Sequence, residues 1–205
     1  MKKIFITGIG TDVGKTIVSA IIVEALRADY FKPVQAGDLT YSDTDKVKEL
    51  VSNEVSVFHK NSYALQTPMS PHAAAAIDGV TIDSKSIQLP KTKNDLIIEG
   101  AGGLLVPIND TETILDLIQS DYKVVVVSRH YLGSINHTLL TIQLLQQKGF
   151  NPVIIFNGNE HNTTESIIKK MTNASVIGRI DNEPYFDKNV ILEYADLFRE
   201  ALSDL

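Results

Sequence analysis

The feature that most constrains the fold is a glycine-rich segment near the N-terminus, between an apolar run and a segment with helical spacing. Lys3–Thr7 is typical of a β-strand, Gly8–Thr16 of a turn, and Lys15–Ala28 of a helix. Such a turn presents backbone N–H groups and the positive end of a helix to phosphate oxygens. The usual phosphate-binding loop has four residues between its outer glycines, whereas five separate Gly8 from Gly14. The segment therefore predicts a phosphate-binding loop with one extra residue.

Two side chains at the end of this segment have the chemistry of a nucleotide site. Lys15 is placed to contact the β- and γ-phosphates of ATP. The hydroxyl of Thr16 is placed to bind Mg²⁺, which prefers hard oxygen ligands. The alternative is an ordinary glycine-rich turn with both side chains in solvent, but the strand–turn–helix context favours the phosphate site. We therefore predict that the chain uses ATP and Mg²⁺.

The rest of the chain alternates short β-branched runs with longer helical segments, as a parallel sheet with crossover helices does. Further strands are expected at Tyr30–Val34, Asp95–Glu99, Lys123–Ser128, Pro152–Asn157 and Val176–Gly178. Further helices are expected at Thr44–Val51, Thr113–Gln119, Ser134–Gln147, Thr163–Met171 and Asn189–Leu202. Residues 53–93 indicate only a connection with short helices. The pattern predicts one α/β domain over residues 1–205, a P-loop NTPase-like, doubly wound and mostly parallel sheet with helices on both faces.

Composition excludes several classes of function. The 205 residues include no cysteine, so disulfides, a thiol nucleophile and cysteine-bound metal clusters are impossible, and the five histidines lack short zinc-ligand spacing. The formal net charge of −6, without a Lys/Arg-rich run, disfavours nucleic acid as a partner. No apolar run approaches the roughly 20 residues of a membrane helix, and the N-terminal run is too short for a signal peptide. We expect no membrane association and a cytoplasmic location.

Carboxylates that could complete a metal site follow two of the predicted elements. Glu99 ends an apolar strand, and the glycines of Gly100–Gly103 allow backbone to approach a charged ligand closely. An aspartate directly before a helix is commonly an N-cap, so we assign Asp43 to capping and Asp45 to the metal. Lys32 ends the second predicted strand, and its spacing alone is typical of a surface lysine.

Six motifs in register resemble the dethiobiotin synthetase family. They are Gly8–Thr16, Phe31–Gly37, Asp43–Asp45, Thr67–His72, Ile98–Gly103 and Leu132–His137. The resemblance runs from the first strand to about Asn157, and it implies a homodimer with a seven-stranded, mostly parallel sheet. It also implies an ATP-dependent enzyme that joins CO₂ to 7,8-diaminononanoate as a cyclic urea, with small molecules as its substrates.

The resemblance implies a role for each matching residue. Lys15, Lys32 and Thr11 are implied as catalytic, the two lysines flanking the carbamate and the γ-phosphate. The residues implied to bind nucleotide are Asp12, Val13, Gly14, Lys15, Thr16, Ile17, Asp45, Glu99, Gly100, Ala101, Gly102, Asn157 and Gly158. Those implied to bind substrate are Thr11, Asp12, Lys32, Ser70, Pro71, Gly102 and Asn136. Mg²⁺ would be held by Thr16, Asp45 and Glu99, and Asn136 would reach the neighbouring subunit's substrate.

One departure and two alternative functions accompany this resemblance. Ala36 stands where many family members have a hydroxyl that contacts substrate, and Thr40 or Ser42 could substitute for it. The first alternative is an ATPase of the partitioning or cobyrinate-synthase branch, although residues 9–13 lack the lysine typical of partitioning ATPases. The second is a non-catalytic module that senses ATP, against which a second cation at Lys32 argues.

Overall fold

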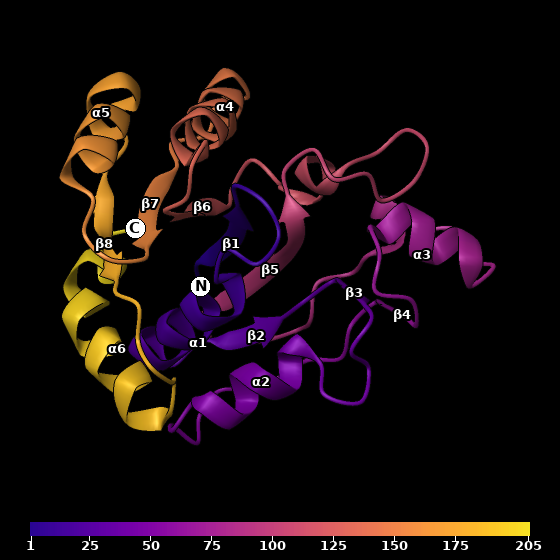
Figure 1. Cartoon of the computed structure of the whole chain (residues 1–205). Helices are drawn as coiled ribbons and strands as arrows, with labels where there is room; N and C mark the ends of the chain where they lie inside the picture. The colour runs from indigo at the N-terminus through magenta and orange to yellow at the C-terminus, as the bar shows by residue number, and fades with distance from the viewer.

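The computed structural model describes residues 1–205 and contains a six-stranded sheet with helices on both faces (Figure 1). Its strands are β1 (Lys3–Gly8), β2 (Asp29–Phe31), β5 (Leu96–Gly103), β6 (Lys123–Arg129), β7 (Val153–Asn157) and β8 (Val176–Ile180). The helices around it are α1 (Lys15–Leu26), α2 (Asp43–Leu50), α4 (Ser134–Gln147), α5 (Asn162–Thr172) and α6 (Lys188–Ser203). The predicted α/β fold class is confirmed.

The strand order β2-β5-β1-β6-β7-β8 places the first strand in the middle of the sheet. All neighbouring strands are parallel. The chain leaves β1 toward β2 on one side and reaches β6, β7 and β8 on the other, so the order reverses at β1. Ligands of doubly wound sheets bind beyond the carboxyl ends of the strands at such a reversal. The glycine-rich loop begins at this point.

Two layers of helices cover the sheet. Figure 1 shows α4 and α5 on one face, and α1, α2 and α6 on the other. Residues Ala20–Val23 of α1 are fully buried because this helix packs between the sheet and α6. Residues Val124–Val127 of β6 are likewise buried at successive positions, as expected for a strand covered on both faces. None of the helices combines the length and apolar composition needed to cross a membrane.

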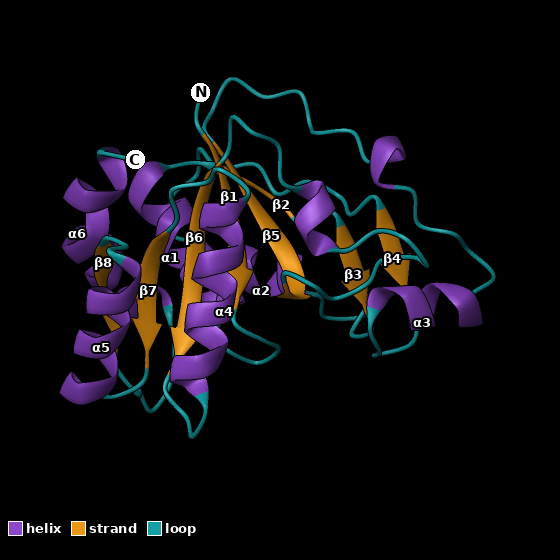
Figure 2. Ribbon diagram, turned by 90° about the horizontal axis from the view of Figure 1, so that it is seen from above, coloured by secondary structure: helices purple, strands orange, loops and turns teal.

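A smaller unit lies beyond the β2 edge of the main sheet (Figure 2). It contains the parallel strands β3 (Val34–Ala36) and β4 (Tyr63–Leu65), the helix α3 (Pro71–Ile77) and the 3₁₀ helix η1 (Ser84–Ser86). The prediction of a single strand at Tyr30–Val34 is therefore wrong. Pro33, which has no N–H group for a ladder, separates β2 from β3. The implied seven-stranded sheet is likewise corrected to six strands plus this pair.

One predicted helix is reduced to a single turn. Thr113–Gln119 was expected to be helical, but only the 3₁₀ helix η2 (Ile114–Leu117) forms there. Thr113 and Asp116 close a reciprocal capping box around that turn, and Ile118 is already extended. In contrast, α4 has the predicted bounds to the residue, because its apolar spacing and the glycine that follows it agree. The connection over residues 53–93 contains short helices, as expected, and also the strand β4.

Candidate functional site

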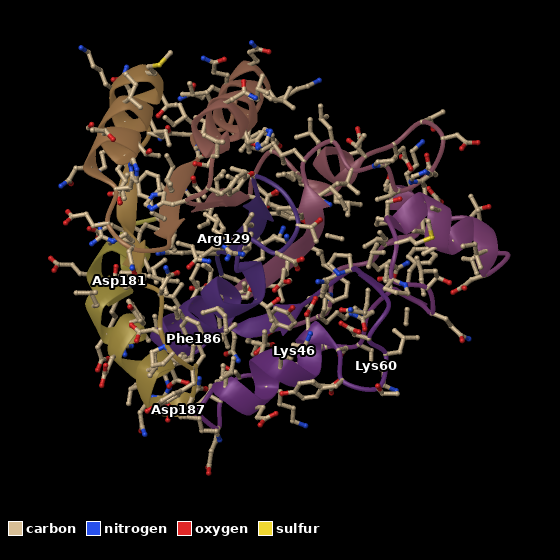
Figure 3. All side chains as sticks on the ribbon, viewed as in Figure 1. Lys46, Lys60, Arg129, Asp181, Phe186 and Asp187 are labelled. Atoms are coloured by element: carbon tan, nitrogen blue, oxygen red, sulfur yellow. The ribbon has the colours of Figure 1, made fainter.

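A cavity of about 990 Å³ opens beyond the carboxyl ends of β1, β2 and β5. The predicted site residues that line it are Thr11, Asp12, Gly14, Lys15, Thr16, Ile17, Lys32, Ser70, Pro71, Glu99, Ala101 and Gly102. Those outside its lining are Val13, Asp45, Gly100, Asn136, Asn157 and Gly158. Asp43, which the sequence assigned to helix capping, also lines it, as do residues that sequence reasoning missed, among them Gln35, Lys46 and Phe186. Figure 3 shows Lys46 near the start of α2 and Phe186 in front of α1.

The loop from β1 to α1 needs glycine at both ends. A Cβ atom at Gly8 would overlap the Val13 side chain, so this residue serves as the first loop glycine although the spacing is one residue longer than usual. Gly14 has φ 97°, and a Cβ atom there would overlap the amide of Asn157. Asn157 Nδ2 in turn donates a hydrogen bond to Val13 O at 2.8 Å. Asn157 therefore holds the backbone of the loop from the end of β7.

Lys15 lies over the loop that precedes it. Its Nζ donates to the carbonyl oxygen of Gly10 at 3.0 Å, and the residue is 7% exposed. Burial lowers the pKa of the Lys15 ammonium, and the positive charge of Lys32 adds to this, while Glu99 opposes it. An anion in the cavity would relieve both effects, so Lys15 is well placed to hold a phosphate group.

Glu99 is the most fully hydrogen-bonded side chain of the site. Its Oε1 accepts from Thr16 Oγ1 at 3.2 Å and from Lys32 Nζ at 3.1 Å. Its Oε2 accepts from Ser19 Oγ at 2.7 Å and from Tyr30 Oη at 2.9 Å. The carboxylate is 1% exposed, and these four donors satisfy it. The buried donors Ser19 and Tyr30 fix the orientation of the carboxylate through Oε2, and Oε1 faces the cavity with Thr16 and Lys32.

Lys32 is a buried cation between two carboxylates and not the surface lysine that its spacing suggested. It is 5% exposed and forms ion pairs with Glu99 and with Asp43. Burial alone would lower the pKa of the Lys32 ammonium, but the two carboxylates outweigh it and raise the pKa. Burial would raise the pKa of Asp43, and the charge of Lys32 outweighs it in turn, so that pKa is lowered. Both groups are thus charged at neutral pH.

The prediction that Asp43 caps α2 is wrong. The N-cap of α2 is Ser42, and Asp45 Oδ2 accepts from its backbone N at 2.8 Å and from its hydroxyl at 2.6 Å, completing a capping box. The carboxylate of Asp45 is thereby engaged outside the cavity, whereas Asp43 lines the cavity and pairs with Lys32. The Ser-x-x-Asp spacing was the signal that could have found this arrangement.

The oxygen ligands around Lys32 fit a magnesium site completed by phosphates. Thr16, Glu99 and Asp43 offer one hydroxyl and two carboxylates, which are the hard donors that Mg²⁺ prefers. These residues form no cluster of three metal-binding carboxylates or histidines. A nucleotide-bound Mg²⁺ needs only one or two protein carboxylates, because phosphate and water oxygens fill the remaining positions.

The fold and the loop define the class of the protein, a doubly wound α/β protein with a P-loop at the switch point of its sheet. The MinC:MinD cell division protein complex of Aquifex aeolicus superposes with a TM-score of 0.58 at 14% identity, covering 100% of this chain and 97% of that one. A ParA family ATPase from Chlorobium tepidum TLS superposes with a TM-score of 0.57 at 14% identity, covering 99% and 96%. At these identities the likeness establishes the fold.

Sequence relatives narrow the class to one family. A protein-family model described as "AAA domain" matches residues 2–190. ATP-dependent dethiobiotin synthetase BioD of Christiangramia forsetii is 60% identical over 205 residues, covering 100% of this chain and 99% of the relative. The protein of the same name from Cytophaga hutchinsonii is 51% identical over 198 residues, covering 95% and 96%. The chain belongs to the dethiobiotin synthetase family.

Proposed function

We propose that this chain is an ATP-dependent ligase that converts 7,8-diaminononanoate and CO₂ into dethiobiotin, with ADP and phosphate as the other products. Family membership supports this activity. The observation that carries it is the buried Lys32 beside the phosphate loop. A nucleotide sensor needs no second cation there, whereas transfer of a phosphoryl group to an anionic acceptor does, because the two anions repel each other.

The proposed reaction has three steps. An uncharged amine of the substrate attacks CO₂ and loses a proton, which gives a carbamate. A carbamate oxygen then attacks the γ-phosphorus of ATP, ADP leaves, and a carbamic-phosphoric anhydride forms. The second amine attacks the carbonyl carbon of this anhydride, loses a proton and expels phosphate, closing the cyclic urea. Phosphoryl transfer of this kind depends mainly on positioning and charge neutralisation.

The residues that line the cavity and those that adjoin it divide between these tasks. Lys15 and Lys32 would neutralise the γ-phosphate and the carbamate. Thr16, Glu99 and Asp43 would hold Mg²⁺, which spreads the charge of the phosphates when bound. The residues proposed to contact the nucleotide through the loop and the neighbouring strand ends are Asp12, Val13, Gly14, Ile17, Gly100, Ala101, Asn157 and Gly158. Those proposed to contact the diamine or its carbamate are Thr11, Asp12, Ser70, Pro71 and Gly102.

We also propose that the enzyme is a cytoplasmic homodimer whose subunits share their sites. Asn136 is exposed on α4 and lies outside the cavity of its own chain, which supports a role toward a second subunit. Leu132, two residues before that helix begins, is fully exposed, as expected of an apolar residue that a partner covers.

The test is ADP release from Mg-ATP and bicarbonate, measured with and without 7,8-diaminononanoate, with the cyclic urea identified by mass. We expect ADP release that depends on the diamine and yields one dethiobiotin per ADP. Lys15→Ala is the control, and we expect it to abolish both signals because it removes the cation on the phosphates. ATP hydrolysis that is indifferent to the diamine, without the cyclic product, would contradict the proposal.

A further inference from the structure

Asp43 is held by two lysines and not by one. Lys32 Nζ pairs with its Oδ2, and Lys46 Nζ lies 3.3 Å from its Oδ1. Asp43 and Lys46 are three residues apart on α2, a spacing that places side chains on the same face of a helix. Each oxygen of the carboxylate proposed to bind the metal therefore already faces an ammonium group.

Lys46 belongs to the cavity although none of the motifs that identify the family includes it. It lines the cavity together with Lys15 and Lys32, and its side chain is 34% exposed. Figure 3 shows Lys46 on α2. Its Nζ also lies 3.7 Å from Asp38 Oδ2 and 5.9 Å from the centre of the Tyr41 ring. Lys46 therefore keeps an anionic and an aromatic neighbour, Asp38 and Tyr41, when Asp43 binds another cation.

A divalent cation that approaches Asp43 without nucleotide meets the positive charges of Lys32 and Lys46. Lys32 also pairs with Glu99, whereas Lys46 is the more exposed of the two lysines and pairs with the other oxygen of Asp43. Its charge opposes free metal at Asp43 and favours the phosphates of a nucleotide in the same cavity. When metal and phosphates enter together, the phosphates offset that repulsion.

We propose that Lys46 is a positioning residue that neutralises the second oxygen of Asp43 until the metal arrives with a nucleotide. This inference rests on the proposed function only in treating Asp43 as the metal ligand. Lys46 suppresses the binding of free metal and strengthens the binding of free nucleotide, so that the two bind cooperatively. The role is electrostatic, and an arginine at this position preserves it.

The experiment compares Lys46→Met, which keeps the length of the side chain and removes its charge, with Lys48→Met on the same helix. Lys48 is exposed, has no ion pair and lies outside this cavity. Binding of Mn²⁺ alone is followed by electron paramagnetic resonance, and binding of ADP in EDTA by calorimetry. For Lys46→Met we expect at least about threefold tighter Mn²⁺ binding and at least about threefold weaker ADP binding. Lys48→Met is expected to change each affinity by less than about 1.5-fold.

Two further variants test the role of Lys46 in binding assays that do not depend on the proposed synthetase activity. Asp43→Asn should weaken Mn²⁺ binding, and Lys46→Arg should match the unaltered protein in both assays. Unchanged Mn²⁺ binding in Lys46→Met, or equal changes in Lys48→Met, would overturn the role of Lys46. Unchanged Mn²⁺ binding in Asp43→Asn would overturn the role of Lys46 as well, because Asp43 would then not be a metal ligand. None of these assays uses the diamine, so failure of the synthetase activity is detected independently by the ADP-release test.

Discussion

At the scale of single residues, the site depends on how one buried carboxylate is oriented. Glu99 has Ser19 and Tyr30 on the oxygen that faces the protein, and Thr16 and Lys32 on the oxygen that faces the cavity. Tyr30 is fully buried, and both its burial and the charge of Glu99 raise its pKa well above the ordinary value. The phenol is therefore a neutral, permanent donor to Glu99, and it contributes to stability as well as to geometry.

Replacing Tyr30 with phenylalanine removes this donor with little change in shape. We expect Tyr30→Phe to lower the free energy of unfolding by about 1–3 kcal/mol, because a buried charged oxygen loses a hydrogen bond. The measurement is urea denaturation. Tyr185→Phe is the matched control, since Tyr185 is 64% exposed and its hydroxyl has no hydrogen-bond partner, and its expected effect is within about 0.5 kcal/mol. Equal losses in the two variants would mean that the contact with Glu99 is not stabilising.

At the scale of elements, α2 carries Asp45, which closes its capping box, and Asp43, which is proposed to bind the metal. We expect Asp45→Ala to destabilise the protein by about 0.5–2 kcal/mol, because the capping box with Ser42 is lost, and to leave Mg-ADP affinity unchanged. Asp43→Asn should instead lower Mg-ADP affinity, measured by calorimetry at several Mg²⁺ concentrations. If Asp45→Ala alters the Mg²⁺ dependence of ADP binding as strongly as Asp43→Asn does, Asp45 binds the metal as the sequence predicted.

The elements also show what the sequence could predict. The bounds of α4 followed from local spacing alone, because apolar residues recur on one face and Gly149 comes directly after the last turn. The strands β3 and β4 have three residues each and pair across 29 positions, so no local pattern specifies them. Only a tertiary arrangement brings them together, and Pro33 redirects the chain toward them.

The candidate site divides in the same way. The glycine-rich loop was predictable because consecutive residues form it. Glu99 was predictable from the apolar run before it, although β5 does not end there but continues to Gly103. Lys32 needed the family resemblance, because its spacing alone resembles that of a surface lysine. Gln35, Lys46 and Phe186 come from three separate segments and meet only at the cavity, so nothing in the sequence marks them as neighbours.

At the scale of the whole molecule, the proposed homodimer builds each site from two chains. Lys15 and Lys32 line the cavity of their own chain, whereas Asn136 lies outside it on α4. A shared site would receive Asn136 from the second subunit of a symmetric dimer. Each site would then take Lys15 from one subunit and Asn136 from the other. Lys15→Ala and Asn136→Ala should each have little activity when present in both subunits.

Mixing the two variants tests this arrangement. After subunit exchange, random pairing should make about half of the dimers heterodimers, each with one intact site of two, so about a quarter of full activity should return. A mixture of Lys15→Ala with Lys32→Ala is the control and should stay inactive, because both residues belong to the same chain's cavity. Recovery is measured as dethiobiotin formed per chain, and sedimentation confirms that dimers are present. If the mixture of Lys15→Ala and Asn136→Ala also stays inactive, Asn136 does not act across the interface.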